Sequence, residues 1–560
     1  MTGGLATLLQ GLSPHLIIVP ILLPLVAGCL LLWLDSRRHV VKAALSLAAV
    51  LANLLVAALL LQRTVRGGAE AFTVYLPSNW EVPFGIVLVL DRLSALMLLV
   101  AALVALAALV FSLARWHRAG AHFHVLFQVQ VMGLNGAFLT ADLFNLFVFF
   151  EVMLAASYGL LLHGSGPARV RAGLHYLTIN LAASSLFLIG ASMIYGVVGT
   201  LNMADIAAKI PAVPAADRPL LHAASAILAV AFLAKAAMWP LNFWLAPAYA
   251  SASAPSGAVF TMLTKVGIYV LLRMSTLMFS GEAGDSAGFG STWLLWGGMA
   301  TLVFGALGVL GSQRPVRLAS FSVIVSSGTL MAMLGVGRPD VTAGALYYLP
   351  SSVFAVAAFF LLTELMDRSR NPDPAEQRAP EDEEDHLPFA LADQELERDT
   401  NLDDDETVLI GRPIPAATAL LGVAFIACAL LVAGLPPLSG FVGKFMMLAA
   451  LLNPPGAAIA WAHWLLVAIV IGSGLLSLIA LSRTGIRFFW TPIDRSAPIA
   501  RSVEYLPIAM LVMLCLWLAL RADVAFSYTR ATAELVHAPR QYIEAVFAAR
   551  PVPSPTAARP

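Results

Sequence analysis

Residues 433–445 read AGLPPLSGFVGKF and lie inside a long apolar segment. The adjacent prolines Pro436 and Pro437 interrupt a helix, because proline offers no backbone N–H group. Lys444 follows a short distance later, although a charge at the centre of a bilayer costs ~3 kcal/mol. The stretch therefore predicts a helix that is broken inside a membrane, where protein or water satisfies both the freed backbone groups and the lysine.

Apolar segments recur along the whole chain. The sequence has 560 residues, of which 59% are hydrophobic and only 12% are charged. Runs of about 20 apolar residues can each cross a bilayer as a helix, and they are too long for the alternating strands of a membrane barrel. We predict an all-α polytopic membrane protein with about 14 transmembrane helices. The expected spans are 15–34, 41–62, 92–113, 123–141, 143–163, 173–198, 220–245, 252–275, 292–311, 318–336, 341–365, 413–434 (continuing brokenly to 452), 460–482 and 503–521.

The composition excludes several classes of function. The formal net charge is zero, so no basic field favours nucleic acid as a partner. Cys29, Cys428 and Cys515 lie far apart in apolar runs and lack CxxC spacing, which argues against zinc or iron–sulfur ligation. We therefore expect no metal site.

Positive charges are unevenly distributed among the loops. The loops after the first, third, fifth, ninth and thirteenth spans are richer in Arg and Lys than the loops between them. By the positive-inside rule the richer loops face the cytoplasm, so both termini face the outer, periplasmic side of a bacterial inner membrane. The residues concerned are Arg37, Arg38, Lys42, Arg115, Arg118, Arg169, Arg171, Arg314, Arg317, Arg483, Arg487, Arg495 and Arg501.

Two segments are more hydrophilic. Residues 366–412 are strongly acidic, which favours a flexible cytoplasmic loop, with partner docking or regulation as the alternative. The tail after Arg521 has amphipathic character, and the sequence leaves open whether it lies on the membrane surface or against another subunit.

Four ionisable side chains lie within apolar spans: Glu151, Lys235, Lys265 and Lys444. Such groups are costly in hydrocarbon and usually face a hydrated interior with partners. Burial disfavours the charged form of both carboxylates and amines, which brings proton exchange toward neutral pH. We interpret the four residues as a proton relay.

The structural alternative is a Glu–Lys pair that fixes helix packing, or lysines that extend to an interface. Mid-span positions make the second option poor for Lys235 and Lys265. Asp91 and Asp142 lie at span ends, and we interpret them as interfacial or capping groups.

The helix breaks follow a repeat pattern. Pro240 lies in MWPLNFW (238–244), and Pro436 and Pro437 lie in LPPLSGF (435–441), five spans later. An odd offset inverts the second unit relative to the first, and paired broken helices are typical of inverted-repeat transporters. We predict two inverted five-helix repeats that contain broken helices.

Three stretches carry a family resemblance: DLFNLFVFFEVM (142–153), LAKAAMWPLNFWLAPAYASASAPSGAVFTMLTKVGIY (233–269) and AGLPPLSGFVGKF. They resemble the antiporter-like subunits shared by Mrp (Mnh/Pha) multisubunit monovalent cation/proton antiporters and the membrane arm of respiratory complex I. YLPSNWEVPFGIVLVLDRLSALM (75–97) and the acidic segment are more similar to the D-type subunit of the Mrp group. The similarity covers nearly the whole chain.

The resemblance implies a division of the chain. Residues 1–122 would hold helices 1–3 and a periplasmic loop, and residues 123–275 the first repeat, helices 4–8. Residues 276–482 would hold the second repeat, helices 9–13, with the acidic loop 366–412. Residues 483–560 would hold helix 14 and the amphipathic tail.

The resemblance also implies roles. The glutamate matching Glu151 tunes the proton affinity of the lysine matching Lys235, the lysine matching Lys265 bridges two half-channels, and the lysine matching Lys444 leads to the opposite half-channel. It implies no bound cofactor. The implied partners are the A, B, C, E, F and G types of antiporter subunit, membrane lipid, protons, and Na⁺ or K⁺.

The chain departs from many relatives in the eleventh span, where those carry histidine in a broken helix. Here Pro350, Ser351 and Ser352 stand in YYLPSSVFAVAAFF (347–360). Serine and water can still form a hydrogen-bonded chain. Ser439 is a further candidate hydrogen-bonding neighbour, beside Lys444.

We therefore expect a secondary transporter subunit, not an enzyme, that moves protons in exchange for export of Na⁺ or K⁺. The alternative is a proton-pumping membrane subunit of a redox complex, such as complex I or a membrane hydrogenase. The chain carries no quinone, flavin or iron–sulfur signature, but neither do those pump subunits. A structural scaffold is disfavoured, because it would gain nothing from four costly ionisable residues.

Overall fold

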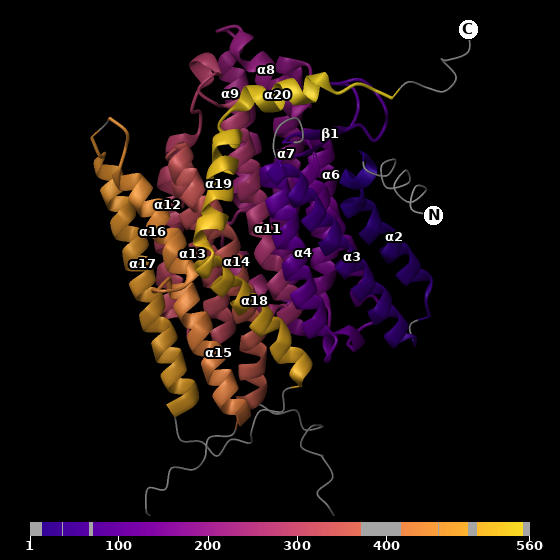
Figure 1. Cartoon of the computed structure of the whole chain (residues 1–560), viewed down its shortest axis with the longest axis vertical. Coiled ribbons are helices and arrows are strands. Elements are labelled where there is room, and N and C mark those ends of the chain that lie inside the picture. Colours follow the sequence, from indigo (N-terminus) through magenta and orange to yellow (C-terminus); the bar gives the residue numbers. More distant parts are fainter. Residues whose placement is uncertain are drawn as a thin grey trace, which may run out of the picture.

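The apolar runs form helices whose lengths suit a bilayer (Figure 1). The computed structural model describes residues 14–35, 37–66, 71–370, 416–456, 458–490 and 501–552. In this part of the chain eleven helices are long and apolar enough to cross a membrane. They are α3 (His39–Arg66), α4 (Arg92–Ser112), α6 (Leu143–Leu162), α7 (Pro167–Val198), α9 (Arg218–Lys235), α11 (Ala254–Arg273), α12 (Ser291–Gly311), α13 (Pro315–Gly335), α14 (Pro339–Arg370), α17 (Trp461–Gly485) and α18 (Ser502–Leu520).

Shorter elements complete the described chain. Four are apolar helices: α2 (Val19–Trp33), α5 (Phe123–Leu139), α15 (Ala416–Ala433) and α16 (Ser439–Leu452). The others are η1 (Pro14–Ile17), β1 (Thr73–Tyr75), β2 (Leu88–Leu90), η3 (Trp116–Arg118), α8 (Met203–Lys209), η4 (Ile210–Ala212), α10 (Leu245–Ser251), η5 (Met274–Met278), η6 (Gly284–Ser286), η7 (Ile486–Trp490), α19 (Ala522–Val536) and α20 (Pro539–Ala548).

These helices correspond to the predicted spans. The eleven long helices of the described residues, together with α2, α5 and α15, occupy the expected segments, and α16 is the continuation of the twelfth. The all-α polytopic fold is confirmed. The seventh span differs in its boundary, because α9 already ends at Lys235 and α10 starts only at Leu245.

The eleventh span differs from the implied broken helix. α14 is one helix from Pro339 to Arg370, with Pro350 inside it. Its membrane window is entirely buried, and α11, α13, α16, α18 and α19 all pack against it. Proline removes only one helical hydrogen bond. Neighbours on every side therefore hold this helix continuous through Pro350.

The structure describes only the first residues of the acidic segment but most of the C-terminal tail. α14 extends through the first residues of segment 366–412 to Arg370, and residues 371–415 lie outside the described residues. The C-terminal tail forms α19, which packs on α14 and α4, and α20, which contacts α8 and β1. The described tail therefore lies against this chain's own helices, an arrangement that the sequence did not suggest.

Both described ends of the chain lie at one end of the bundle, beside the antiparallel hairpin β1–β2 (Figure 1). His15 hydrogen-bonds the Tyr75 hydroxyl at 2.9 Å. The Asn79 side chain donates to the Val552 carbonyl at 2.9 Å and accepts from the Val552 N–H at 2.7 Å. We call this the hairpin end.

The opposite end is where α14 ends and α15 and α18 begin, and we call it the basic end (Figure 1). Its arginines bind backbone carbonyls of neighbouring loops. Arg483 donates to the Ser312 carbonyl at 3.0 Å, and Arg501 donates to the Ala114 carbonyl at 3.2 Å. The loops that the sequence marks as rich in positive charge thus meet here.

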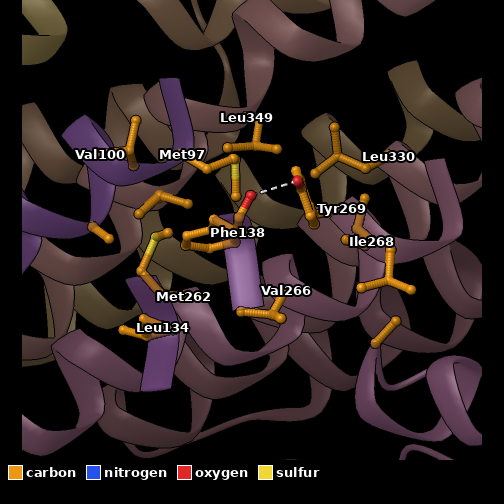
Figure 2. Packing of buried hydrophobic residues seen from close by; sticks show 14 of the residues in the cluster. Met97, Val100, Leu134, Phe138, Met262, Val266, Ile268, Tyr269, Leu330 and Leu349 are labelled. Atoms are coloured by element: carbon orange, nitrogen blue, oxygen red, sulfur yellow. Dashed lines mark hydrogen bonds between the residues drawn. The ribbon is translucent and has the colours of Figure 1, made fainter. Parts of the chain in front are cut away.

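The core lies along the central helices. α11, α13 and α14 are buried over almost their whole length, whereas outer helices such as α3 and α17 expose many apolar residues. Met97, Phe138, Ile268, Leu330 and Leu349 pack together from α4, α5, α11, α13 and α14 (Figure 2). Polar side chains among these helices are shielded from lipid.

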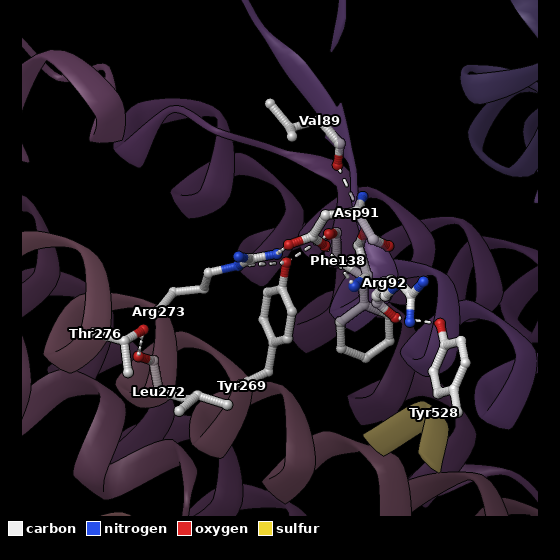
Figure 3. A network of polar contacts seen from close by, with 10 residues as sticks. Val89, Asp91, Arg92, Phe138, Tyr269, Leu272, Arg273, Thr276 and Tyr528 are labelled. Carbon is white, nitrogen blue, oxygen red and sulfur yellow. Dashed lines mark hydrogen bonds and ion pairs between the residues drawn. The ribbon is translucent and has the colours of Figure 1, made fainter. Parts of the chain in front are cut away.

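A buried ion pair holds α4 and α11 together near the hairpin end. Asp91 is the N-cap of α4 and exchanges hydrogen bonds with Ser94 in a capping box, as its span-end position predicts. Its carboxylate also pairs with Arg273 at the end of α11, which was not predicted (Figure 3). Beside them, Tyr269 donates to the Phe138 carbonyl at 2.7 Å.

α20 covers this ion pair. The ring of Tyr542 lies 5.3 Å from the Arg273 guanidinium, a cation–π distance. At the junction of α19 and α20, His537 shares a 3.0 Å hydrogen bond with Thr342 on α14. Burial lowers the pKa of His537 from 6.5 to about 4, despite the opposing effect of the Asp340 carboxylate.

We predict that docking of the C-terminal segment weakens in acid. Because the pKa of His537 is lower when docked than its ordinary value, the undocked state binds the proton more tightly. The stabilisation from neutral His537 is therefore present above pH 6.5 and lost as the pH falls toward about 4. Hydrogen exchange of residues 522–552 against pH would measure it.

His537→Gln should remove most of this pH dependence, whereas His175→Gln, at an exposed position on α7, should keep it. An unchanged acid response in His537→Gln would contradict the assignment.

Candidate functional site

Glu151 lies in the middle of α6, a helix whose first turn is fixed by a side-chain cap. Asp142 is the N-cap of α6 and accepts a hydrogen bond from the Asn145 N–H at 2.9 Å, which confirms the capping interpretation. On the neighbouring helix α7, the Ser184 hydroxyl donates to the Glu151 carboxylate. Glu151 is thus held from α7 by a neutral donor.

Lys235 is the last residue of α9 and is buried. Its ammonium lies 4.8 Å from the ring centroid of Phe150, next to Glu151 on α6, in a cation–π contact. The Glu151 charge is close enough to act on Lys235, but among the ion pairs of the described residues none joins the two. The carboxylate therefore influences the amine without locking it in a salt bridge.

Side chains of the protein bind two backbone groups at the helix break after Lys235. The Trp244 indole donates to the Ala234 carbonyl at 3.2 Å, and the Trp239 N–H donates to the Thr301 hydroxyl of α12 at 2.8 Å. Residues 236–244 can therefore be non-helical at membrane depth. Thr301 was not identified from the sequence.

Lys265 lies at the centre of the buried helix α11 and is 2% exposed. Its ammonium donates to the Ser327 hydroxyl of α13 at 3.3 Å. At Gly267 a side chain would place its Cβ 2.8 Å from the backbone nitrogen of Ala236. This close approach sets Lys265 against the break that follows Lys235.

Lys444 lies in the first turns of α16 and is buried. It donates at 2.9 Å to the Ala433 carbonyl at the end of α15, a group that the break leaves without a helical partner. Gly434 adopts a φ of 75°, and a Cβ there would lie 2.9 Å from the Lys444 ammonium. The lysine and the break therefore form one local structure.

The proline side chains lie on the outside of this arrangement. Pro240, Pro436 and Pro437 are exposed, whereas Lys235 and Lys444 are buried. Each break thus turns its prolines outward and its lysine inward.

Serine pairs connect the helices of the second half. Ser326 of α13 donates to Ser352 of α14 at 2.9 Å. Ser351 of α14 hydrogen-bonds Ser439 at the start of α16 at 2.8 Å. With the contact between Lys265 and Ser327, these bonds lead from α11 across α13 and α14 to the helix that carries Lys444.

Comparisons with known proteins agree with this architecture. The family model for the membrane part of NADH:quinone oxidoreductase and Mrp antiporter subunits matches residues 140–378. A probable D subunit of a K⁺/H⁺ antiporter from Rhizobium meliloti (strain 1021) is 51% identical over 541 residues, which cover 96% of this chain and 98% of the relative. The chain belongs to the family of Mrp antiporter D subunits.

Further D-subunit relatives extend the similarity. The D subunit of the Na⁺/H⁺ antiporter of Alkalihalophilus pseudofirmus (strain ATCC BAA-2126 / JCM 17055 / OF4) is 34% identical over 540 residues, covering 95% of this chain and 99% of the relative. A chain of the Mrp complex from Dietzia sp. DQ12-45-1b superposes with a TM-score of 0.79 at 25% identity, covering 96% of this chain and 99% of that one.

Several site contacts of this D-subunit family member were missed from the sequence. Ser184, Ser326 and Ser327 are uncharged and were not distinguished from other small residues. A usable signal existed, because SSGTL (326–330) places paired hydroxyls in an otherwise apolar span. Within the described residues, no group of three His, Cys, Asp or Glu side chains could hold a metal ion.

We predict that Gly434→Ala disturbs Lys444. The added Cβ would crowd the ammonium at 2.9 Å and would also suffer the left-handed backbone conformation. Gly456→Ala is a matched control, since Gly456 has a φ of 70° but nothing within 4 Å of an added Cβ. The backbone penalty, about 1 kcal/mol, is common to both variants.

Thermal unfolding of the purified protein would measure both. Gly434→Ala should lose more stability than Gly456→Ala by a further 1–3 kcal/mol, roughly the range for overpacking. Equal losses would show that the contact between Gly434 and Lys444 contributes nothing.

Proposed function

We propose that this chain moves protons across a bacterial inner membrane as one subunit of a multisubunit Na⁺(K⁺)/H⁺ antiporter, and that it is a transporter subunit, not an enzyme. The observation that carries the proposal is the series of buried amines, Lys235, Lys265 and Lys444, with Glu151 acting on the first. Relatives named as D subunits of K⁺/H⁺ and Na⁺/H⁺ antiporters support the exchange reaction.

Lys235 is the loading group of the proposed relay. Its ammonium form is stabilised by the Glu151 charge and the Phe150 ring, and no direct salt bridge to Glu151 holds it in the described structure. A change in the charge or position of Glu151 therefore changes how tightly Lys235 holds its proton. Lys265 is the next acceptor, because α11 lies against the break beside Lys235.

Serine hydroxyls carry the proposed transfer onward. A hydroxyl both donates and accepts, so it passes a proton without itself becoming charged for long. Ser327 contacts Lys265, Ser326 contacts Ser352, and Ser351 contacts Ser439. In this proposal the pairs take the place of the histidine found in many relatives, and Lys444 delivers the proton to the opposite half-channel.

The proposal includes the division and orientation of the chain. Residues 123–275 and 276–482 form the two inverted repeats, with the breaks after Lys235 and Ala433 at corresponding places. The basic end faces the cytoplasm by the positive-inside rule, and the hairpin end faces the periplasm. The partners are the A, B, C, E, F and G types of subunit.

We predict that Lys235→Ala and Glu151→Ala in the complete antiporter lower exchange by about 100-fold, the low end of contributions from general acid–base groups. The measurement is cation-induced ΔpH in everted vesicles from an antiporter-deficient host that expresses the entire operon. Lys209→Ala is the control, because Lys209 is half-exposed and pairs with Asp205 on the short helix α8. Full exchange in Lys235→Ala would refute the relay.

A proton-pumping subunit of a redox complex is the second candidate, since the matching family model also describes NADH:quinone oxidoreductase. Affinity purification of the native complex separates the two. Small antiporter subunits should co-purify, and NADH dehydrogenase or hydrogenase subunits in their place would favour the redox complex.

A further inference from the structure

A cavity of about 310 Å³ lies at the basic end, apart from the lysines. It is lined by the last turns of α14, the start of α11, the loop after α10 and the indole of Trp116. Glu364 on α14 faces this cavity with a side chain that is 13% exposed. The relay described above does not use this carboxylate.

Close packing of α14 on α11 brings Glu364 to its place. At Gly257 an added Cβ would lie 3.0 Å from the Phe360 ring, so the two helices meet closely there. Glu364 lies one turn beyond Phe360, and the backbone N–H of Ala254, the first residue of α11, is within electrostatic reach of its carboxylate. The carboxylate thus lies at the N-terminus of the helix that carries Lys265.

These contacts hold the Glu364 carboxylate in place but compensate its negative charge only in part. The Trp116 indole, a neutral donor, lies 2.7 Å from both carboxylate oxygens. Arg368 approaches Glu364 only to 3.7 Å, because its guanidinium binds Glu504 of α18 more closely. Two carboxylates therefore share one nearby arginine.

Other charges face the cavity from its remaining walls. Arg169 of α7 lies over the Trp116 ring at 5.2 Å and is within electrostatic reach of Glu364. Arg314 of α13 and Asp367 of α14 also line the cavity. Together these charged groups set the electrostatic potential in the cavity.

Several hydroxyl side chains lie along α11, starting at the cavity. Ser253 lines the cavity and hydrogen-bonds Ser256 at 2.8 Å. Thr261 and Thr264 follow on the same helix, and Lys265 lies about 17 Å from the cavity at the rise of an α-helix.

We propose that Glu364 is the group through which protons pass between solvent at the basic end and the route along α11 to Lys265. This inference rests on the proposed proton transport. When the relay runs from Lys444 toward the basic end, Lys265 loses its proton toward the α11 hydroxyls and intervening water, and the Glu364 carboxylate takes it up as a carboxylic acid. The carboxyl group then gives the proton to water in the cavity, with no net change in charge or oxidation state.

Glu364→Gln in the complete antiporter tests the proposal. The amide keeps the size of the side chain and can still accept from Trp116, but it cannot carry a transferable proton in this way. We expect assembled complex with exchange lowered by about tenfold or more, and an altered dependence on the pH outside everted vesicles. Glu534→Gln is the matched control, since it makes the same substitution at an exposed carboxylate of α19 outside the cavity and the relay, and it should exchange like the wild type.

Infrared difference spectroscopy of the purified complex against pH gives a second readout. The C=O band of a protonated carboxyl group should be lost in Glu364→Gln and kept in Glu534→Gln. Wild-type exchange and pH profile in Glu364→Gln, or an equal loss in Glu534→Gln, would overturn the assignment.

The two proposals fail in distinguishable ways. If Lys265→Ala abolishes exchange while Glu364→Gln does not, the transport function stands and the role of Glu364 falls. If the wild-type complex shows no cation-dependent ΔpH but the infrared band titrates and is lost in Glu364→Gln, the proton site stands and the antiport function falls.

Discussion

A helix break inside a bilayer frees backbone N–H and C=O groups where bulk water is not present to bind them. The rest of this structure depends on which groups of the protein satisfy them. The two breaks use different donors. After α9, the Trp244 indole takes the carbonyl of Ala234. After α15, the Lys444 ammonium takes the carbonyl of Ala433. The first break thus leaves Lys235 free to respond to the Glu151 carboxylate, whereas the second break binds Lys444 directly.

Glycines set how closely the helices around the breaks can approach. Gly267 admits the backbone of Ala236, and Gly257 admits the ring of Phe360. Small residues at such interfaces let helices pack tightly where no hydrophobic effect drives them together. The spacing between ionisable groups is therefore fixed by residues that carry no charge themselves.

The fold could be predicted, and the four ionisable residues could be selected as candidates, because their signals are local. A charge within an apolar span, such as Lys265, and a proline within one, such as Pro436, stand out in the sequence alone. The resemblance implied a broken helix in the span that contains Pro350, but packing from all sides holds α14 there as one helix.

Partners far apart in the chain could not be predicted in the same way. Trp116 and Glu364 are 248 residues apart, and Asp91 and Arg273 are 182 apart. The local sequence around one residue of a pair does not indicate its distant partner, because the packing of whole helices decides which side chains meet. Ser184, Ser326 and Ser327 were missed for a further reason, since a Ser in an apolar run often bonds its own helix, as Ser322 does with Leu318.

The covering of Arg273 by Tyr542 has a consequence for how the molecule is completed during synthesis. The Asp91–Arg273 pair joins helices from the first half of the chain and can form early. The ring that covers it belongs to α20, which leaves the ribosome only after the last membrane helix. A chain that stops before α20 would keep the charges together but leave their outer side open. The hairpin end is thus finished only after every membrane-spanning helix of the described residues has been made.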